Sequence, residues 1–536
     1  MIDLNERHLE KRSFFNRLLL VYLFFGAAFL FILYKTYSLQ VAGYSNYEIA
    51  ALKNKTKEVL VQPVRGIIYD RNGNILVNNV PTYDLIIQPS KIKNLDAFIV
   101  ELSKIINFSP EELENINKNF QQKALYNREL TIRKDLSKEE IAKFQVRSYK
   151  FKNAFIDVRY SRENRYPYLF SHAIGYVGGV NNDQLSSILK KQKLKQSETT
   201  FKYSGGFLIG KTGLENIYDS HLRGSFGIKS IEIDAKGKLL KEVGFDKSID
   251  GKSLFTSLDL SSQKIAYDQM GERRGAVVAL DLQTGGIVTY LSTPSFNVND
   301  LSNGMSQAAF NNLINDKNKP FFDRAAQGRY SPASTIKPAI ALFGIKESIV
   351  DWNFTIDDPG FFVLPEDQRV YRGWKKGGHG IINMRDAIIE SSNTFFFSLA
   401  YQSDINSLID HLAQFGFGRN ICNDCFNPDS GLLPTPEWKM NNLNYGWFKG
   451  DTVNLGVGQG YMSATPIQLA YYSGFLASKG NIQGLSFING ETQNKQSFKS
   501  SLSVDDSDWE KIHSSMIGVI EDPKGTAKRL KPLKNY

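Results

Sequence analysis

The spacing of apolar and polar residues differs from one part of the chain to the next, and the clearest feature is an uncharged apolar run near the start. Leu18 to Tyr34 reads LLLVYLFFGAAFLFILY, 17 residues without a charge, and Arg17 and Lys35 bracket it. This length is at the short end of what a membrane-spanning helix needs, and flanking residues can extend it. No later stretch is comparably long and apolar, so the pattern predicts one transmembrane anchor over 18–38.

The charges before the apolar run predict its orientation. Four basic residues lie among the first 17 positions against three acidic ones. An excess of Lys and Arg beside a span favours the cytoplasmic side, so we expect residues 1–17 in the cytoplasm and the rest outside it. A cleaved signal peptide is the alternative, but no convincing small-x-small cleavage site follows the run.

Downstream of the anchor the pattern changes to short β-branched runs. Residues 59–79 alternate such runs with the turn signals Pro63 and Asn72-Gly73, which predicts strands and a hairpin. Ser109 and Ser137 each precede a glutamate three residues later, which is typical of capped helix starts. We therefore expect a β-rich domain with surface helices over 45–252.

A second domain is expected over 253–536. Residues 275–292 read GAVVALDLQTGGIVTYLS, two apolar runs around a Gly-Gly turn, which predicts a β-hairpin. Helical spacing follows at 335–346, 384–400 and 405–415. The mixture predicts an α+β fold.

Composition and charge restrict the possible partners. With 42% apolar residues among 536, the chain is far too apolar for a disordered protein. Its net charge of +10 is scattered among 55 acidic residues rather than gathered in a stripe, so we expect no nucleic-acid partner. Cys422 and Cys425 form a lone CxxC, which argues against structural zinc and could give a strained small-loop disulfide in an oxidising compartment.

The candidate chemistry lies in Ser334-Thr335-Ile336-Lys337, because a serine and a lysine three residues apart at a helix start share one face. That geometry suits a serine nucleophile with a lysine base. Only this copy of the pattern follows Pro332 and the small Ala333, which suit a tight helix entry. Three further SxxK copies lie at Ser90/Lys93, Ser187/Lys190 and Ser261/Lys264.

The segment YSPASTIKP resembles the first motif of the penicillin-binding transpeptidases, and Ser391-Ser392-Asn393, 57 residues later, resembles their second motif, SxN. Segments at 65–73 and 210–215 resemble the non-catalytic pedestal of the class B enzymes, particularly the penicillin-binding protein 2 group. The resemblance extends from the anchor to about residue 530. It implies a β-rich pedestal followed by a serine-transpeptidase domain, built on an antiparallel sheet with helices.

The resemblance implies roles for four residues: Ser334 as the acylated nucleophile, Lys337 as its base, and Ser391 with Asn393 as a proton-shuttling and substrate-orienting pair. The reaction would cross-link the stem peptides of peptidoglycan at their D-Ala–D-Ala bond during cell-wall elongation. β-Lactams would acylate the same serine.

The resemblance also implies a single-pass protein of the bacterial inner membrane with its catalytic domain in the periplasm. No glycosyltransferase segment is recognised, so the expected partner is a membrane glycan polymerase of the shape, elongation, division and sporulation family. No cofactor is expected. Some relatives hold zinc near the second motif with two Asp, a His and a Cys; Asp358 and His379 fit that set, but Gly373 and Ser392 do not, so we predict no metal.

The third motif of the family, Lys-Thr-Gly, is expected after the SxN. Lys211-Thr212-Gly213 precedes Ser334 and is assigned to the pedestal, and the nearest later tripeptide is Lys524-Gly525-Thr526. We therefore expect the chain to stop before the strand that supplies half of the oxyanion hole. Loss of one such donor lowers the rate about 10²–10³-fold, so acylation should be slow.

Two other functions are left open. The missing motif favours a catalytically impaired homologue that acts only as a docking or scaffold protein. Shared SxxK and SxN chemistry also permits a D,D-carboxypeptidase or a β-lactam-hydrolysing or -sensing enzyme, although the long pedestal argues against both.

Overall fold

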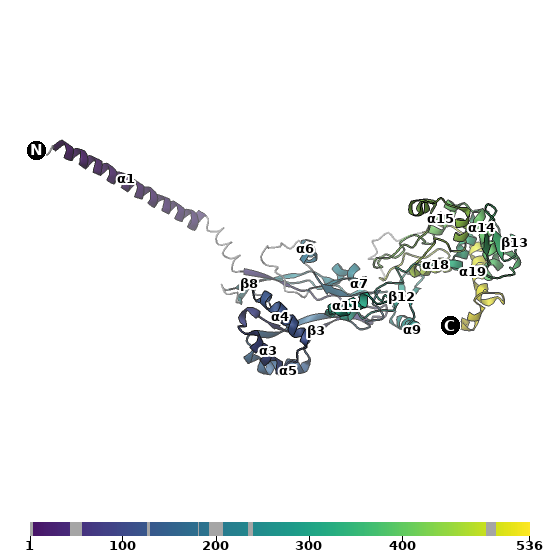
Figure 1. Cartoon of the computed structure of the whole chain (residues 1–536), viewed down its shortest axis with the longest axis horizontal. Coiled ribbons are helices and arrows are strands. Elements are labelled where there is room, and N and C mark those ends of the chain that lie inside the picture. The colour runs from purple at the N-terminus through teal and green to yellow at the C-terminus, as the bar shows by residue number, and fades with distance from the viewer. Residues whose placement is uncertain are drawn as a thin grey trace. The chain divides into compact units, whose positions relative to one another are not determined.

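The computed structural model describes residues 4–42, 56–125, 129–180, 182–191, 207–233, 239–488 and 500–535 (Figure 1). These fall into two compact units. The first unit comprises Met1–Pro63, Asp183–Tyr203 and Ser225–Ile249, and the second comprises Val64–Asn182, Ser204–Gly224 and Asp250–Tyr536.

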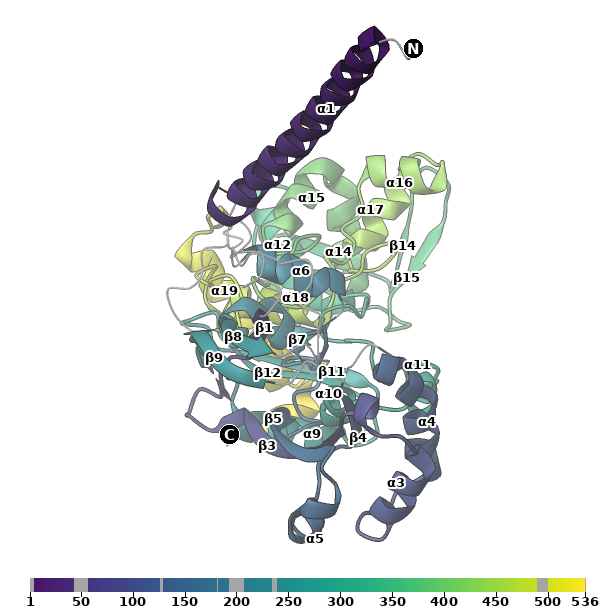
Figure 2. The same ribbon diagram turned by 90° about the vertical axis from the view of Figure 1, so that its left-hand side faces the viewer.

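The first unit contains the predicted anchor as one long helix, α1 (Leu4–Tyr37), followed by a π-helical turn (Ser38–Ala42). A stretch of 28 residues, Phe14–Val41, is apolar enough to cross a membrane, and its side chains are exposed. This stretch is longer than the predicted 18–38, because apolar residues continue on both sides of the uncharged run. The helix begins well before the apolar run, so residues that we expected in a cytoplasmic segment are part of it (Figure 2).

The same unit holds a three-stranded antiparallel sheet in the order β1-β8-β9. Its strands are β1 (Thr56–Val61), β8 (Gly227–Ile233) and β9 (Leu239–Asp246). Strand β1 pairs with a strand more than 160 residues later in the chain. Segments far apart in the sequence therefore build this sheet.

In the second unit, a five-stranded sheet forms the pedestal core in the order β10-β2-β3-β4, with β5 paired to β3. The predicted hairpin at Asn72-Gly73 is confirmed: β2 and β3 are antiparallel, and Gly73 has φ +84°. Asp70 accepts the backbone N–H groups of Asn72 and Asn74, which closes the turn. The strands are β2 (Ile68–Tyr69), β3 (Ile75–Ile87), β4 (Leu130–Arg133), β5 (Ala154–Asn164) and β10 (Leu254–Phe255).

Helices α3 (Leu95–Ser103), α4 (Pro110–Leu125) and α5 (Lys138–Arg147) pack beside this sheet through a separate apolar cluster (Figure 1). Both predicted capping boxes are present: Ser109 and Ser137 each exchange hydrogen bonds with the glutamate three residues later.

A cluster of buried, oppositely charged side chains lies in the pedestal part of the second unit. Glu215, in α7 (Gly213–Ile217), binds Arg162 at 2.7 Å and Arg65 at 2.6 Å. Burial opposes ionisation of Glu215, but the two guanidinium groups outweigh it and lower the pKa of this carboxyl below its usual value. Lys211-Thr212-Gly213 lies here, between β7 (Leu208–Gly210) and α7.

In the rest of the second unit, helices α12 (Lys337–Lys346), α14 (Asn393–Gln402) and α18 contribute buried side chains to one apolar core. The predicted hairpin is confirmed as β11 (Gly275–Leu280) and β12 (Ile287–Thr293), with α9 (Leu260–Met270) packed on β12 and α18 (Pro466–Ala477) on β11. The predicted helix at 405–415 is present as α15 (Ile405–Ala413). Other elements here are α10 (Val298–Asn303), α11 (Gln307–Ile314), α16 (Pro436–Leu443), α17 (Lys449–Leu455) and α19 (Asp506–Glu521).

The predicted continuous helix over 384–400 is wrong. The chain instead forms α13 (Met384–Ile389) and α14 (Asn393–Gln402), separated at Glu390–Ser392. Two short antiparallel strand pairs precede this break: β13 (Thr355–Asp358) with β16 (Gly380–Asn383), and between them the hairpin of β14 (Phe361–Val363) and β15 (Val370–Arg372). Cys422 and Cys425 form the disulfide that the sequence suggested.

Candidate active site

Ser334 lies in a 3-10 turn, Ala333–Ile336, that leads into α12 (Lys337–Lys346). Its side chain is exposed. Ala333 has φ +49°, a conformation that costs a non-glycine residue about 1–3 kcal/mol and therefore needs support from its surroundings. Gly458 supplies that support, because its carbonyl accepts the Ala333 N–H at 2.9 Å and the Ser331 hydroxyl at 2.5 Å.

Lys337 points into the protein and is only 1% exposed. Its Nζ donates to Asn393 Oδ1 at 2.7 Å, to Ser391 Oγ at 3.0 Å and to the Ser391 carbonyl at 2.9 Å. Burial lowers the pKa of this amine to about 7, and the negative charge of Asp358 acts in the opposite direction. A substantial fraction of Lys337 is therefore neutral near pH 7 and able to accept a proton.

The break between α13 and α14 explains how the second motif reaches Lys337. Ser391 has φ +55°, which turns the chain sharply, and Ser392 then caps α14 by accepting the Phe395 N–H at 3.2 Å. As a result, Ser391 on one side and Asn393 on the other both contact the same amine.

Of the four residues expected from the sequence, the structure brings Lys337, Ser391 and Asn393 into contact. Ser334 lies three residues before Lys337 in the same turn, and its Oγ forms no hydrogen bond with any residue that the structure describes. The pedestal tripeptide at 211–213 belongs to the turn between β7 and α7, not to this site.

Further buried polar residues lie next to the second motif. The sequence indicates them only as possible metal ligands. Asp358 Oδ2 accepts Ser392 Oγ at 2.7 Å and lies 2.6 Å from His379 Nδ1. Gly373 lies near these residues, because its N–H donates to the carbonyl of Gly360, two residues after Asp358, at 2.8 Å.

The residues present do not fit a four-coordinate zinc ion. Gly373 offers no donor, Ser392 offers a neutral hydroxyl in place of a thiolate, and Asp358 binds His379 directly. Within the described ranges, no group of three or more His, Cys, Asp or Glu side chains is arranged to hold a metal.

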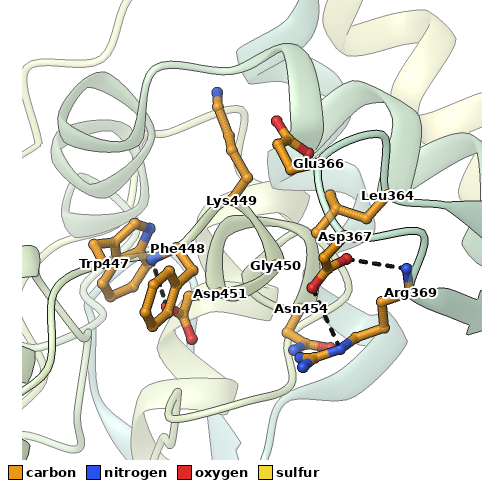
Figure 3. A pocket seen from close by; sticks show the side chains of 10 residues that line it. All are labelled: Leu364, Glu366, Asp367, Arg369, Trp447, Phe448, Lys449, Gly450, Asp451 and Asn454. Carbon is orange, nitrogen blue, oxygen red and sulfur yellow. Dashed lines mark hydrogen bonds and ion pairs between the residues drawn. The ribbon is translucent and has the colours of Figure 1, made fainter.

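A pocket of about 480 Å³ opens beside the same core, between the β14–β15 turn and the start of α17 (Figure 3). The side chains of Trp447 and Phe448 form one wall, and Asp367 with Arg369 lies on the opposite side. The backbone carbonyl of Asn454, another lining residue, accepts the N–H of Gln459, which follows Gly458 in the loop that contacts the Ser334 turn. The remaining lining residues are Leu364, Glu366, Lys449, Gly450 and Asp451.

Comparison with known proteins places this geometry in a family. Residues 60–256 match the model of the penicillin-binding protein dimerisation domain, and residues 275–535 match that of the penicillin-binding protein transpeptidase domain. The peptidoglycan D,D-transpeptidase MrdA of Acinetobacter baumannii is 37% identical over 91% of this chain and 72% of its own. The chain belongs to the class B penicillin-binding proteins of the penicillin-binding protein 2 type.

Other members of this family agree with the assignment. MrdA of Haemophilus influenzae is 32% identical over 93% of this chain and 77% of its own, and MrdA of Escherichia coli K12 is 31% identical over 92% and 78%. A solved complex of penicillin-binding protein 2 with MreC from Helicobacter pylori has a TM-score of 0.73 at 28% identity, covering 88% of this chain and 86% of that one. The protein is thus a penicillin-binding peptidoglycan D,D-transpeptidase with an N-terminal helix that is able to span a membrane.

Proposed function

We propose that this transpeptidase works through an acyl-enzyme on Ser334, with Lys337 as its base. The supporting observation is the burial of Lys337 against Ser391 and Asn393, which lowers the pKa of the amine to about 7. A neutral amine in the same helical turn takes the proton from Ser334 Oγ as that oxygen attacks the D-Ala–D-Ala carbonyl. D-Ala then leaves as the amine that received a proton.

Ser391 and Asn393 divide the remaining tasks. The Ser391 hydroxyl touches Lys337 Nζ and carries the proton between this amine and the leaving group. Asn393 holds the amine through its Oδ1 and leaves its NH₂ group for a substrate carbonyl. An amine of a neighbouring stem peptide then attacks the acyl-enzyme, releases Ser334 Oγ and forms the cross-link.

We further infer that the protein acts in cell-wall elongation, anchored in the inner membrane with its catalytic half in the periplasm. The similarity to MrdA proteins and the exposed apolar helix α1 support this location. The related protein from Helicobacter pylori was solved with MreC, which supports a scaffold partner of that type. A membrane glycan polymerase is the second partner that we propose, because no glycan-polymerising segment is recognised in this chain.

Labelling with a fluorescent penicillin tests the nucleophile. The full chain, purified in detergent, should form one covalent adduct that is seen by gel and intact mass, and Ser334→Ala should abolish it. Ser261→Ala is the matched control, because Ser261 also lies three residues before a lysine near a helix start. This variant should be labelled as strongly as the wild type. A folded wild-type protein that takes no label would instead favour a docking role.

A further inference from the structure

Ser392 is the middle residue of the second motif. It lies between Ser391 and Asn393, the two residues that hydrogen-bond to Lys337. It is fully buried at 0% exposure, and its hydroxyl makes two hydrogen bonds. It donates to Asp358 Oδ2 at 2.7 Å and accepts the Phe395 N–H at 3.2 Å. Because a hydroxyl has a single proton, the bond to Asp358 fixes its direction and leaves a lone pair for the helix cap.

Asp358 is itself held rigidly at the end of β13, 34 residues before Ser392. Its Oδ1 accepts the Gly360 N–H at 2.7 Å, and its Oδ2 lies 2.6 Å from His379 Nδ1. The Asp358 carbonyl accepts the His379 N–H at 2.9 Å, so backbone and side chain both tie the two strand ends together. The Asp358 carboxylate and the His379 imidazole are each no more than 2% exposed.

The second motif needs such support because Ser391 is in the left-handed region at φ +55°. This strained residue keeps its place only if its neighbours hold it. On its C-terminal side the holding contacts are those of Ser392: its N–H donates to the Ala387 carbonyl, and its hydroxyl binds Asp358.

We propose that Asp358 is a positioning residue for this active site: through Ser392 it fixes the backbone that presents Ser391 and Asn393 to Lys337, by hydrogen bonds and without a metal ion. The proposal rests on the proposed role of Lys337. His379 orients the carboxylate from the other side. Asp358, His379 and Ser392 thus bind one another directly, and Gly373 offers no side-chain donor.

Two substitutions test this link. Ser392→Ala removes the hydroxyl with little change in volume. Asp358→Asn leaves one acceptor oxygen in place of two, so its NH₂ faces either the Gly360 N–H or the His379–Ser392 pair. We expect the first-order acylation rate constant with a β-lactam to fall about 10- to 100-fold in both variants, the usual range for residues that orient a functional group. The dissociation constant of the non-covalent complex should stay within about twofold of the wild type, because neither residue reaches the exposed Ser334.

Ser486→Ala provides the matched control. Ser486 is equally buried and also donates to a buried carboxylate, Asp424, at 2.7 Å, but it does not belong to the second motif. This variant should lose a similar amount of thermal stability while its acylation rate constant stays like that of the wild type. If Ser392→Ala, Asp358→Asn and Ser486→Ala all lost the same fraction of the acylation rate, general destabilisation would explain the loss. That result would overturn the proposal.

Two further measurements decide the remaining outcomes. Hydrogen exchange over 384–402 should be faster in Ser392→Ala and Asp358→Asn than in Ser486→Ala, and this readout holds even if the wild type takes no β-lactam. Unchanged exchange would refute the positioning role independently of the proposed function. Dialysis of the wild type against a chelator should leave its acylation rate unchanged, whereas a loss that zinc restores would show that a metal supports the motif.

Discussion

The role that we propose for Lys337 follows from its position in the fold. Three oxygen atoms from Ser391 and Asn393 surround its amine, and almost no solvent reaches it. The three contacts are with neutral groups, so they do not offset the loss of hydration as a carboxylate would. This balance distinguishes the lysine from a surface lysine, which stays charged at every physiological pH.

Acylation should therefore depend on pH in a defined direction. Burial lowers the pKa of Lys337 to about 7, so the amine is mostly an ammonium below that value and cannot accept the Ser334 proton. We expect the second-order acylation rate constant with a penicillin to rise as the pH increases through about 7 and then to level off. Stopped-flow or gel-based rates between pH 5 and 9 measure it. A flat profile in the wild type would contradict the assigned role, and Lys337→Ala should be slow at every pH.

At the scale of elements, the four-residue loop closed by Cys422 and Cys425 carries a buried carboxylate into the core. Asp424, inside the loop, accepts the Phe487 N–H at 2.9 Å and the Ser486 hydroxyl, while Asn423 N–H donates to the Leu485 carbonyl at 2.8 Å. Burial raises the pKa of Asp424, and the hydrogen bonds that it accepts oppose that rise. The disulfide holds this costly group in place.

Opening that disulfide should destabilise the transpeptidase half by about 2 kcal/mol, as expected from the chain entropy of a four-residue loop. The measurement is thermal unfolding of the wild type with and without reductant, beside the double variant Cys422→Ser/Cys425→Ser. The double variant should match the reduced wild type and should not respond to reductant. A melting temperature that reductant leaves unchanged in the wild type would count against this role.

Local signals predicted the elements that depend on neighbouring residues. The turn at Asn72-Gly73 and the cap formed by Ser137 with Glu140 lie within a few positions in the chain, so the sequence alone contains them. The continuous helix over 384–400 was predicted wrongly because apolar residues at helical spacing lie on both sides of a short polar run, 390–394. At this break Ser392 binds Asp358, 34 residues earlier in the chain, and no local pattern shows that contact. Ser334 and Lys337 were indicated by their spacing as well as by the family resemblance, whereas Ser391 and Asn393 came from the resemblance alone. Asp358 was considered only as a possible metal ligand, and no local pattern indicated its contact with Ser392.

At the scale of the whole molecule, residues distant in the sequence meet in a few buried polar contacts. Glu215 connects Arg65, near the start of the second unit, with Arg162 on β5. Three residues further on, Tyr218 donates to Asp424, which joins the segment matched to the dimerisation domain with the segment matched to the transpeptidase domain. The domain boundaries 45–252 and 253–536 stay a prediction, and the Tyr218–Asp424 contact lies across them.

Removing the charge of Glu215 should destabilise the protein strongly. Glu215→Ala removes the carboxylate partner of the buried Arg162 and leaves Arg65 with Asp219 alone; breaking a buried pair in this way costs about 3–5 kcal/mol. The arginines lower the pKa of Glu215 in the folded protein. The stability that the ionised carboxylate contributes is therefore present at neutral pH, and it is lost as the pH falls through this lowered pKa. Thermal unfolding and limited proteolysis measure the effect.

The matched control is Glu139→Ala, because Glu139 is 76% exposed and pairs with Lys143 on the same helix. Its loss should change stability by no more than about 0.5 kcal/mol. If the two variants melt alike, the buried cluster does not stabilise this unit as proposed.

Gly458 restricts how the site can change under selection. Its φ is +66°, and a Cβ there would lie 2.4 Å from the Ala333 carbonyl oxygen and 2.8 Å from the Ala333 nitrogen. Any side chain at position 458 would therefore displace the turn that carries Ser334. This displacement would impair the reaction of Ser334 with a drug and with the natural substrate alike. Mutations that confer β-lactam resistance without loss of cross-linking have to arise at other positions of this site.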